Sequence, residues 1–134
     1  MPLPRLYRII LPVPDIEHAA RFWAAVCDSP GERVSPGRHY FDCGGTILAC
    51  YDPAADGDEV GDGWRHHPSQ YVYFAVADLE AMAGRLVAAG ARDVTAPATM
   101  PWGERMIYAL DPFGTPISFV DETTLFTGGQ AEPA

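Results

Sequence analysis

The pattern of apolar and polar positions predicts two copies of one strand–helix unit. A strand-like apolar run, YRIILPV, ends at Val13, and a second one, YVYFAV, ends at Val76. After each run, apolar residues recur at the three- and four-residue spacing of an amphipathic helix. Asp15 and Asp78 precede these segments, where a carboxylate can accept hydrogen bonds from the free N–H groups of a first helical turn. The pattern therefore predicts one helix after each of these two aspartates.

Three short strand-like segments follow each predicted helix. They read ERVS, RHYFDC and TILACY in the first half, and RDVTA, ERMIYAL and TPISFV in the second. The last two segments of each half are joined by similar turns, DCGGT and DPFGT, in which Gly45 and Gly114 allow a positive φ at little cost. The chain is thus predicted to hold two βαβββ modules, at 5–51 and 70–122, with an acidic, Gly- and Pro-rich linker at 52–69 and a tail at 123–134.

Composition and charge narrow the class of protein. The 134 residues suffice for a single α+β domain, 1–134, and 48% of them are hydrophobic. A formal net charge of −9 argues against nucleic acid or an anionic membrane surface as a partner. There is no apolar run long enough to span a bilayer and no secretory pattern at the start, which favours the cytoplasm. The three cysteines, which form no CxxC motif, are expected to be reduced thiols.

The two modules resemble a known group of proteins. V-x-D followed by Ile-Glu or Leu-Glu opens each helix, and PWGERMIYALDPFGTPISFVDE stands near the end of the second module. These features resemble the vicinal oxygen chelate superfamily of glyoxalases, bleomycin resistance proteins and extradiol dioxygenases, and most of all its short bleomycin-resistance-like members. The resemblance covers residues 5–122. It implies tandem βαβββ modules whose curved mixed sheets form a cup, and a homodimer.

The resemblance also implies where a metal would bind. Enzymes of this superfamily hold a divalent cation with side chains at four strand positions, which correspond here to Arg8, Ala49, Tyr71 and Ser118. Arginine offers no lone pair, alanine has no donor atom, and neutral hydroxyls are weak ligands for Mn, Fe, Ni or Zn. No metal ligands and no cofactor are therefore expected.

Strand alternation predicts which side chains share the inner face of the cup with those positions. These side chains are mostly aromatic or apolar, with few polar groups among them, a composition that suits a small-molecule site. The predicted ligand-binding residues are Arg8, Tyr51, Tyr71, Tyr73, Trp102, Glu104, Met106, Tyr108 and Ser118.

Other readings of these side chains stay open. The tyrosines could instead fill the cup as core, and Trp102 could pack over a strand end. Arg8 requires a partner, which could be Glu104, another carboxylate, or an anionic or carbonyl-bearing ligand. Arg105 should point away from Glu104 and take part in a surface or interface salt bridge.

Two functions follow as hypotheses. The first is a metal-independent protein of the bleomycin-resistance type that sequesters an aromatic or polycyclic molecule in a Tyr- and Trp-lined groove. The second is a glyoxalase- or dioxygenase-like lyase or oxidoreductase. It would either have an unconventional metal site with residues such as His39 and Glu104, or be metal-free with His39 or Tyr108 as acid or base. A divalent metal belongs only to this second hypothesis. The acidic linker is interpreted as solvated, or as a surface that attracts a cationic ligand.

Overall fold

The computed structural model describes residues 3–126, and the chain divides into two compact units at 1–67 and 68–134. Each unit contains the predicted order of one strand, one helix and three strands, so the α+β fold of tandem βαβββ modules is confirmed. The end of the predicted tail, residues 127–134, lies outside the described residues.

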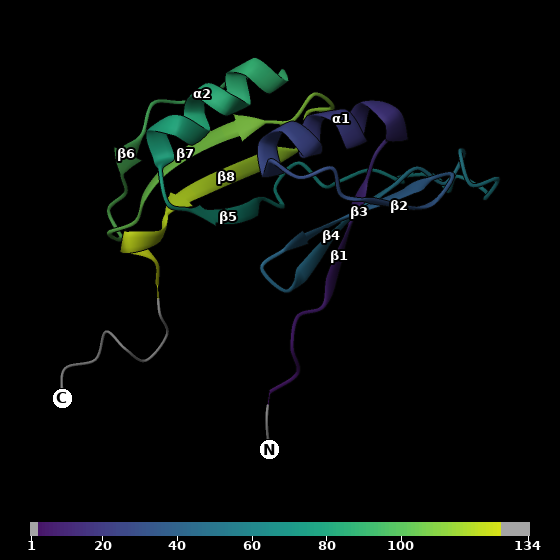
Figure 1. Ribbon diagram of the computed structural model, residues 1–134, viewed down its shortest axis with the longest axis horizontal. Helices are drawn as coiled ribbons and strands as arrows, with labels where there is room; N and C mark the ends of the chain where they lie inside the picture. Colours follow the sequence, from purple (N-terminus) through teal and green to yellow (C-terminus); the bar gives the residue numbers. More distant parts are fainter. Residues whose placement is uncertain (1–2, 127–134) are drawn as a thin grey trace. The chain divides into compact units, whose positions relative to one another are not determined.

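The described part of the first unit forms a four-stranded sheet with one helix, α1 (Figure 1). The strand order is β1-β4-β3-β2, with β1 and β4 parallel and the other neighbours antiparallel. The elements are β1 (Arg8–Pro12), α1 (Ile16–Cys27), β2 (Glu32–Ser35), β3 (Arg38–Cys43) and β4 (Thr46–Tyr51).

The described part of the second unit repeats this topology, with strand order β5-β8-β7-β6 and a parallel β5–β8 pair. A short 3₁₀ helix, η1, follows β8. The elements are β5 (Val72–Val76), α2 (Leu79–Ala89), β6 (Ala98–Thr99), β7 (Arg105–Leu110), β8 (Pro116–Asp121) and η1 (Glu122–Thr124).

Both helices begin where the sequence predicts. The Asp15 side chain accepts a hydrogen bond from the backbone N–H of His18, and Asp78 accepts one from Ala81. At the other end of α2, Gly90 takes the left-handed conformation with φ 99°, which closes the helix. Each helix buries one apolar face, through residues such as Trp23 of α1, so packing as well as capping stabilises it.

One predicted strand forms at a different place in the chain. The segment RDVTA contributes only an isolated bridge between Arg92 and Leu110, and β6 forms two residues further along, at Ala98–Thr99. Two local features explain the change. Asp93 has a positive φ of 54°, which interrupts an extended strand, and the Thr95 hydroxyl accepts the N–H of Tyr108 in place of a backbone carbonyl.

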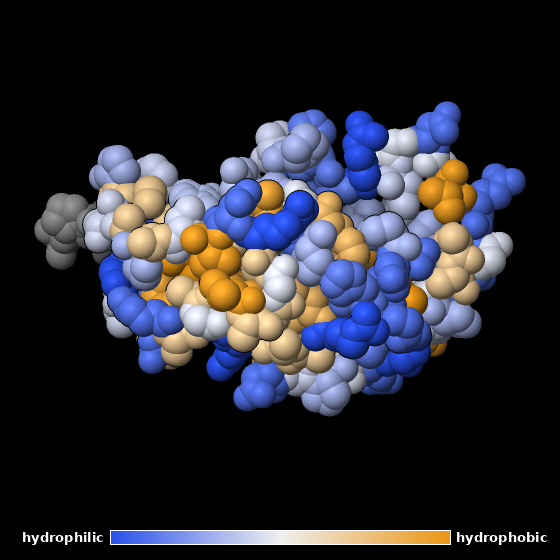
Figure 2. Space-filling model, turned by 90° about the horizontal axis from the view of Figure 1, so that it is seen from above, coloured by the Kyte–Doolittle hydropathy of each residue, from blue (hydrophilic) through white to orange (hydrophobic). Residues whose placement is uncertain are grey.

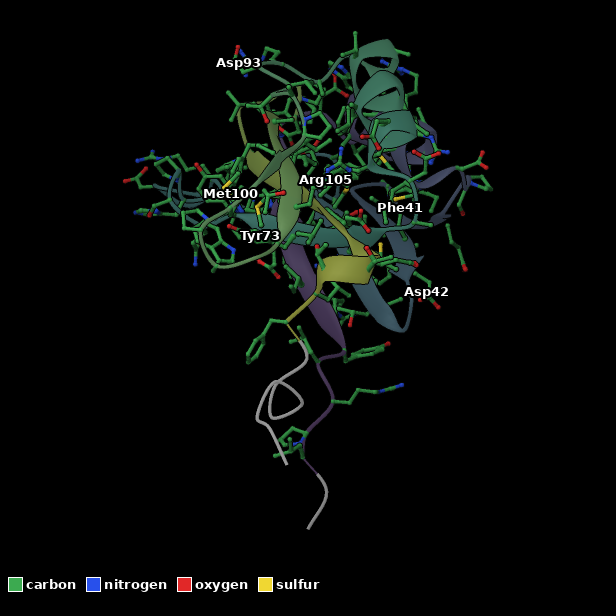
Figure 3. All side chains as sticks on the ribbon, turned by 90° about the vertical axis from the view of Figure 1, so that its left-hand side faces the viewer. Phe41, Asp42, Tyr73, Asp93, Met100 and Arg105 are labelled. Carbon is green, nitrogen blue, oxygen red and sulfur yellow. The ribbon has the colours of Figure 1, made fainter. Side chains whose placement is uncertain are left out.

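The two sides of each sheet differ, as strand alternation requires. In β3, Phe41 is 1% exposed and lies toward the helix side, whereas its neighbour Asp42 points the other way into solvent (Figure 3). The face that does not carry the helix is called the open face of each sheet below. It is the face on which the sequence predicts a ligand site.

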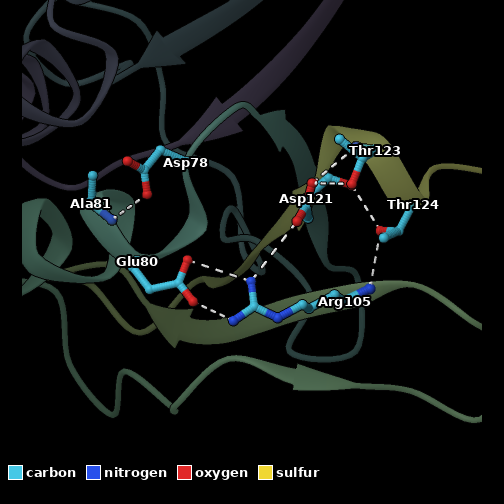
Figure 4. A network of polar contacts seen from close by, with 7 residues as sticks. All are labelled: Asp78, Glu80, Ala81, Arg105, Asp121, Thr123 and Thr124. Atoms are coloured by element: carbon cyan, nitrogen blue, oxygen red, sulfur yellow. Dashed lines mark hydrogen bonds and ion pairs between the residues drawn. The ribbon is translucent and has the colours of Figure 1, made fainter.

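A polar network on the helix side of the second unit surrounds Arg105 (Figure 4). Its guanidinium binds Glu80 of α2 and lies 3.8 Å from Asp121, while its backbone N–H donates to the Thr124 hydroxyl. The hydrogen bond and charge of Arg105 lower the pKa of Glu80, and hydrogen bonds from Thr123 lower the pKa of Asp121. The predicted surface salt bridge of Arg105 is therefore confirmed.

The surface is mixed in polarity. In the view from above, polar residues predominate and apolar ones lie among them (Figure 2). Among the described residues, no helix has the length and apolar character that crossing a membrane would require.

The acidic segment that follows β4 is tied to the first unit. Asp52 is 8% exposed, and its carboxylate accepts the N–H of Ile16 at the start of α1. The Asp56 side chain is 5% exposed and accepts from the Gly37 N–H at 2.6 Å, the Ser35 hydroxyl at 2.9 Å and the Arg38 guanidinium at 2.6 Å. The interpretation of a solvated linker is therefore wrong for these two carboxylates.

Replacing Asp56 should destabilise the first unit. Asp56→Ala leaves three buried or half-buried donors without their acceptor, so we expect the free energy of unfolding to fall by about 2–4 kcal/mol. Urea denaturation measures this loss. Asp62→Ala, at an exposed carboxylate of the same segment, is the matched control and should change stability by less than about 0.5 kcal/mol. Equal effects of the two substitutions would contradict a structural role for Asp56.

Candidate functional site

The open face of the second sheet brings three predicted residues into one row. Tyr73 of β5 pairs with Ser118 of β8, which pairs with Tyr108 of β7. Tyr71 is two residues before Tyr73, just ahead of β5, and lies on the same face. The residues between them, such as Phe74, lie on the opposite face. The predicted sharing of one face by these four side chains is thus correct within the second unit.

The three tyrosines contact one another and form what is called here the tyrosine cluster: Tyr71, Tyr73 and Tyr108. The Tyr71 ring meets Tyr108 edge-on with centroids 5.7 Å apart, and lies 6.2 Å from the Tyr73 ring. The Tyr108 hydroxyl also contributes, after burial, to a raised pKa of Tyr73. Tyr71 is 47% exposed and Tyr73 is 53% exposed, so these two rings are not core residues.

A second exposed aromatic side chain lies in the turn before β7. Trp102, in the turn before β7, donates its indole N–H to Glu104 at 2.8 Å and remains 61% exposed. The other oxygen of Glu104 accepts the backbone N–H of Phe126 at 3.4 Å. The charge of Glu104 makes the smallest contribution to the raised pKa of Tyr73. The hydrogen bond with Glu104 restrains the orientation of the Trp102 indole.

Met106 and Ser118 lie under this surface, and neither is exposed. The Ser118 hydroxyl donates to the Ile107 carbonyl at 2.9 Å and lies 3.6 Å from the Met106 sulfur. Both belong to the open face, as predicted, but in this structure they support the aromatic surface from below.

Arg8 belongs to the open face of the first sheet. Its guanidinium donates to the Tyr40 hydroxyl at 3.1 Å and lies over the rings of Tyr7 and Tyr40, at 5.2 and 5.5 Å from their centroids. Within residues 3–126, no carboxylate forms an ion pair with it. The sequence reasoning missed Tyr40, although its place opposite Ala49 follows from an antiparallel pairing of β3 with β4.

The Tyr51 side chain is in contact with other residues of the first unit. Its hydroxyl donates to Asp58, which raises the pKa of Tyr51, and its ring lies edge-on to Trp64 at 5.4 Å. The Arg38 guanidinium lies over the same ring, 4.1 Å from its centroid. Neither contact was predicted. Arg38 lies opposite Tyr51 through the register of β3 with β4, and Trp64 belongs to the segment after β4, which has no periodicity from which its position could be read.

His39 does not face the cup, which corrects the expectation that it could act there. It alternates with Tyr40 and lies beside Phe41 on the helix side, only 9% exposed. Its Nε2 pairs with the Pro30 carbonyl at 2.8 Å, and its Nδ1 accepts from the Arg33 Nε at 3.2 Å. A general base must reach its substrate, and both ring nitrogens of His39 are already engaged.

The residues at the metal-ligand positions do not fit a divalent cation. The Arg8 guanidinium carries a positive charge, Ala49 has no donor atom, and the Ser118 hydroxyl is committed to the Ile107 carbonyl. The Tyr71 ring packs edge-on against Tyr108. In the described part of the chain, no group of three His, Cys, Asp or Glu side chains is placed to hold a metal ion.

Comparison with known proteins agrees with this fold. Residues 5–119 match the family model of the Glyoxalase/Bleomycin resistance protein/Dioxygenase superfamily, and the chain belongs to that superfamily. No protein in a curated set matches the sequence significantly.

Solved structures extend the comparison to three-dimensional form. A glyoxalase-related enzyme from Fulvimarina pelagi is 22% identical, with a TM-score of 0.73 over 97% of this chain and 96% of that one. A lactoylglutathione lyase from Agrobacterium tumefaciens is 18% identical, with a TM-score of 0.67 over 90% and 96% of the two chains. Identities this low support a common fold and leave the reaction open.

The tyrosine cluster should have a distinct ionisation behaviour. Partial desolvation, followed by interaction with the Tyr108 hydroxyl, raises the pKa of Tyr73 above the ordinary value of about 10. The stability that this neutral phenol contributes is complete below the unfolded pKa and is lost as pH rises through the raised folded pKa. Tyr108→Phe should therefore move the Tyr73 titration to lower pH, as followed by NMR of labelled tyrosine.

Tyr7→Phe, which changes a tyrosine of the first unit, is the control and should leave the Tyr73 titration unchanged. A wild-type Tyr73 that titrates like a free phenol would contradict the contacts described above.

Proposed function

We propose that this protein is a metal-independent binding protein of the bleomycin-resistance type, which sequesters an aromatic or polycyclic small molecule. The observation that carries the proposal is the tyrosine cluster on the open face of the second unit, together with the exposed Trp102 that Glu104 holds by a hydrogen bond. Sequestration requires affinity and no turnover, so the replacement of metal ligands is compatible with it.

The geometry of the aromatic groups favours a planar ligand. Exposed tyrosine and tryptophan rings offer large apolar area at a small cost in side-chain entropy, and ring pairs contribute about 0.5–1.5 kcal/mol beyond that area. Trp102 donates a hydrogen bond to Glu104 and remains 61% exposed, so the indole is accessible to a ligand. A ligand that stacks on this indole would meet the tyrosine hydroxyls as polar anchors.

The charge of the site favours a neutral or cationic molecule. Glu104 is the charged member of this surface, and the whole chain carries a net charge of −9. An anionic ligand would meet repulsion from both. Arg8, in the first unit, is the predicted residue best suited to a carbonyl or carboxylate group, and its only described polar partner among residues 3–126 is Tyr40.

The same proposal includes a cytoplasmic homodimer. β1 is an edge strand that leaves Ile9 37% and Ile10 43% exposed on its two faces, and Leu6 and Tyr7 before it are more exposed still. An open, apolar strand edge is a surface that proteins commonly cover with another chain. We therefore expect a second copy to cover this strand.

Substitutions at the two ends of the aromatic surface should weaken binding without unfolding the protein. Bleomycin and a panel of planar polycyclic compounds are screened by thermal shift, and binders are measured by quenching of tryptophan fluorescence. Trp102→Ala and Tyr108→Ala should each raise Kd by about tenfold, because each removes one stacking face.

Val87→Ala provides the matched control for these variants. Val87 is exposed on α2, away from the open face, and its loss should leave Kd unchanged. If the Trp102 and Tyr108 variants keep wild-type affinity, the aromatic surface is not the binding site.

Light scattering coupled to size exclusion tests the proposed dimer. The wild-type chain should elute with twice its 14.5 kDa mass. Ile10→Glu should produce monomers, because a carboxylate in an apolar contact lacks its hydration. A wild-type chain that is monomeric at all concentrations would exclude the proposed dimer.

A further inference from the structure

The open face of the first sheet carries an arginine that lies over two tyrosine rings. The Arg8 guanidinium is 5.2 Å from the centroid of Tyr7 and 5.5 Å from that of Tyr40, and its Nη1 donates to the Tyr40 hydroxyl at 3.1 Å. These contacts restrict a long side chain that would otherwise sample many rotamers. Arg8 is therefore a preorganised cation, and the proposed binding at the tyrosine cluster makes no use of it.

The charge of Arg8 is not neutralised by these partners. Tyrosine rings and hydroxyls are uncharged, and within residues 3–126 no carboxylate forms an ion pair with Arg8. The acidic residue that shares its row across the sheet is Asp42, since both are opposite Ile47. Two strand spacings, about 10 Å, separate the two backbone positions. The Asp42 carboxylate instead accepts the N–H of Gly45 at 2.8 Å.

Most of the hydrogen-bonding capacity of Arg8 is also open to a ligand. A guanidinium has five N–H donors, and among the described residues Arg8 uses one of them, at Nη1. The edge formed by Nε–H and Nη2–H remains, and the residue is exposed. Two parallel N–H groups on such an edge match the two oxygens of a carboxylate.

The guanidinium lies apart from the free edge of the sheet. β1 is the edge strand, and β3 is two strands inward with β4 between them. Because Arg8 of β1 bonds to Tyr40 of β3, their side chains meet over β4, away from the edge that a second copy would cover. Ala49 of β4, opposite Tyr40, has only a methyl group and leaves space for this contact. An anion at Arg8 is thus compatible with the proposed dimer.

We propose that Arg8 and Tyr40 form a binding site for the carboxylate group of a small organic anion. The Nε–H and Nη2–H groups of Arg8 donate to the two carboxylate oxygens. Tyr40 is a positioning residue, which orients the guanidinium through its hydroxyl. The site lies in the first unit and does not depend on the proposed sequestration at the tyrosine cluster.

The charge balance of this face favours a monoanion. Arg38 lies on the same face, opposite Tyr51, but it is already paired with Asp56, so Arg8 supplies the available positive charge. A carboxylate matches one positive charge better than a phosphate dianion does. The other acidic groups of the chain are screened beyond about 8 Å at physiological ionic strength, so the direct contact with Arg8 prevails over them.

An NMR titration of the ¹⁵N-labelled full-length chain with sodium benzoate tests the site, at an ionic strength held constant with sodium chloride. Benzoate should shift the Arg8 Nε–H resonance and the backbone amides of β1 to saturation, with a Kd on the order of 1 mM. Benzamide, which has the same ring and no charge, should produce no saturable shift. Inorganic phosphate should bind more weakly than benzoate.

Substitutions separate the roles of the two residues. Arg8→Lys keeps the charge and removes the two-donor edge, so the Kd for benzoate should rise about tenfold, as followed through the β1 amides. Tyr40→Phe keeps the ring and removes the hydroxyl. It should raise Kd about threefold and move the Arg8 Nε–H resonance of the ligand-free protein.

Arg21→Lys is the matched control, because Arg21 is an exposed arginine on α1, away from the open face, and its Kd should equal that of the wild type. Circular dichroism checks that all three variants are folded. The proposal is wrong if benzamide or chloride reproduces the benzoate shifts, or if Arg8→Lys and Arg21→Lys bind benzoate equally well. Tighter binding of phosphate would overturn the assignment to a carboxylate, and wild-type affinity in Tyr40→Phe would overturn the role of Tyr40.

Discussion

The register of two parallel strand pairs, β1–β4 and β5–β8, determines which side chains lie on the open face of each unit. Successive residues of these paired strands point alternately toward the helix and toward the open face. A shift of one residue would send Tyr73, Ser118 and Tyr108 under α2 and place Phe74 and Phe119 in solvent. The register that builds the core is thus the same register that assembles the tyrosine cluster.

The two open faces have different chemistry although their folds repeat. In the first unit, cationic groups lie over tyrosine rings, as Arg8 does on Tyr40 and Arg38 does on Tyr51. In the second unit, tyrosines contact one another and a carboxylate orients a tryptophan. Among the described residues, no three His, Cys, Asp or Glu side chains are grouped to hold a metal ion. Both open faces instead carry tyrosine side chains in contact with other aromatic or cationic groups.

The sequence predicted the fold because its signals are local and repeated. Capping aspartates, helical spacing and the Asp-Gly turns recur in both halves, and alternation then sufficed to place Tyr71, Tyr73 and Tyr108 together. It failed where contacts are non-local. The return of Asp52 and Asp56 to the first unit and the hydrogen bond of Tyr51 with Asp58 depend on how separate segments meet. The face of the sheet on which His39 lies was also left undetermined by the sequence. It follows from the pairing of β3 with β4, in which His39 is opposite Cys50.

The central claim is that the metal site of the superfamily has given way to an aromatic binding surface. Elemental mass spectrometry tests it most directly, on protein as purified and after incubation with Fe(II), Mn(II), Ni(II) and Zn(II) followed by desalting. The account predicts no stoichiometric retention of any of these metals, because Arg8, Ala49, Tyr71 and Ser118 supply no suitable ligand set. One tightly held metal ion per chain would contradict it and would return the enzyme hypothesis to first place.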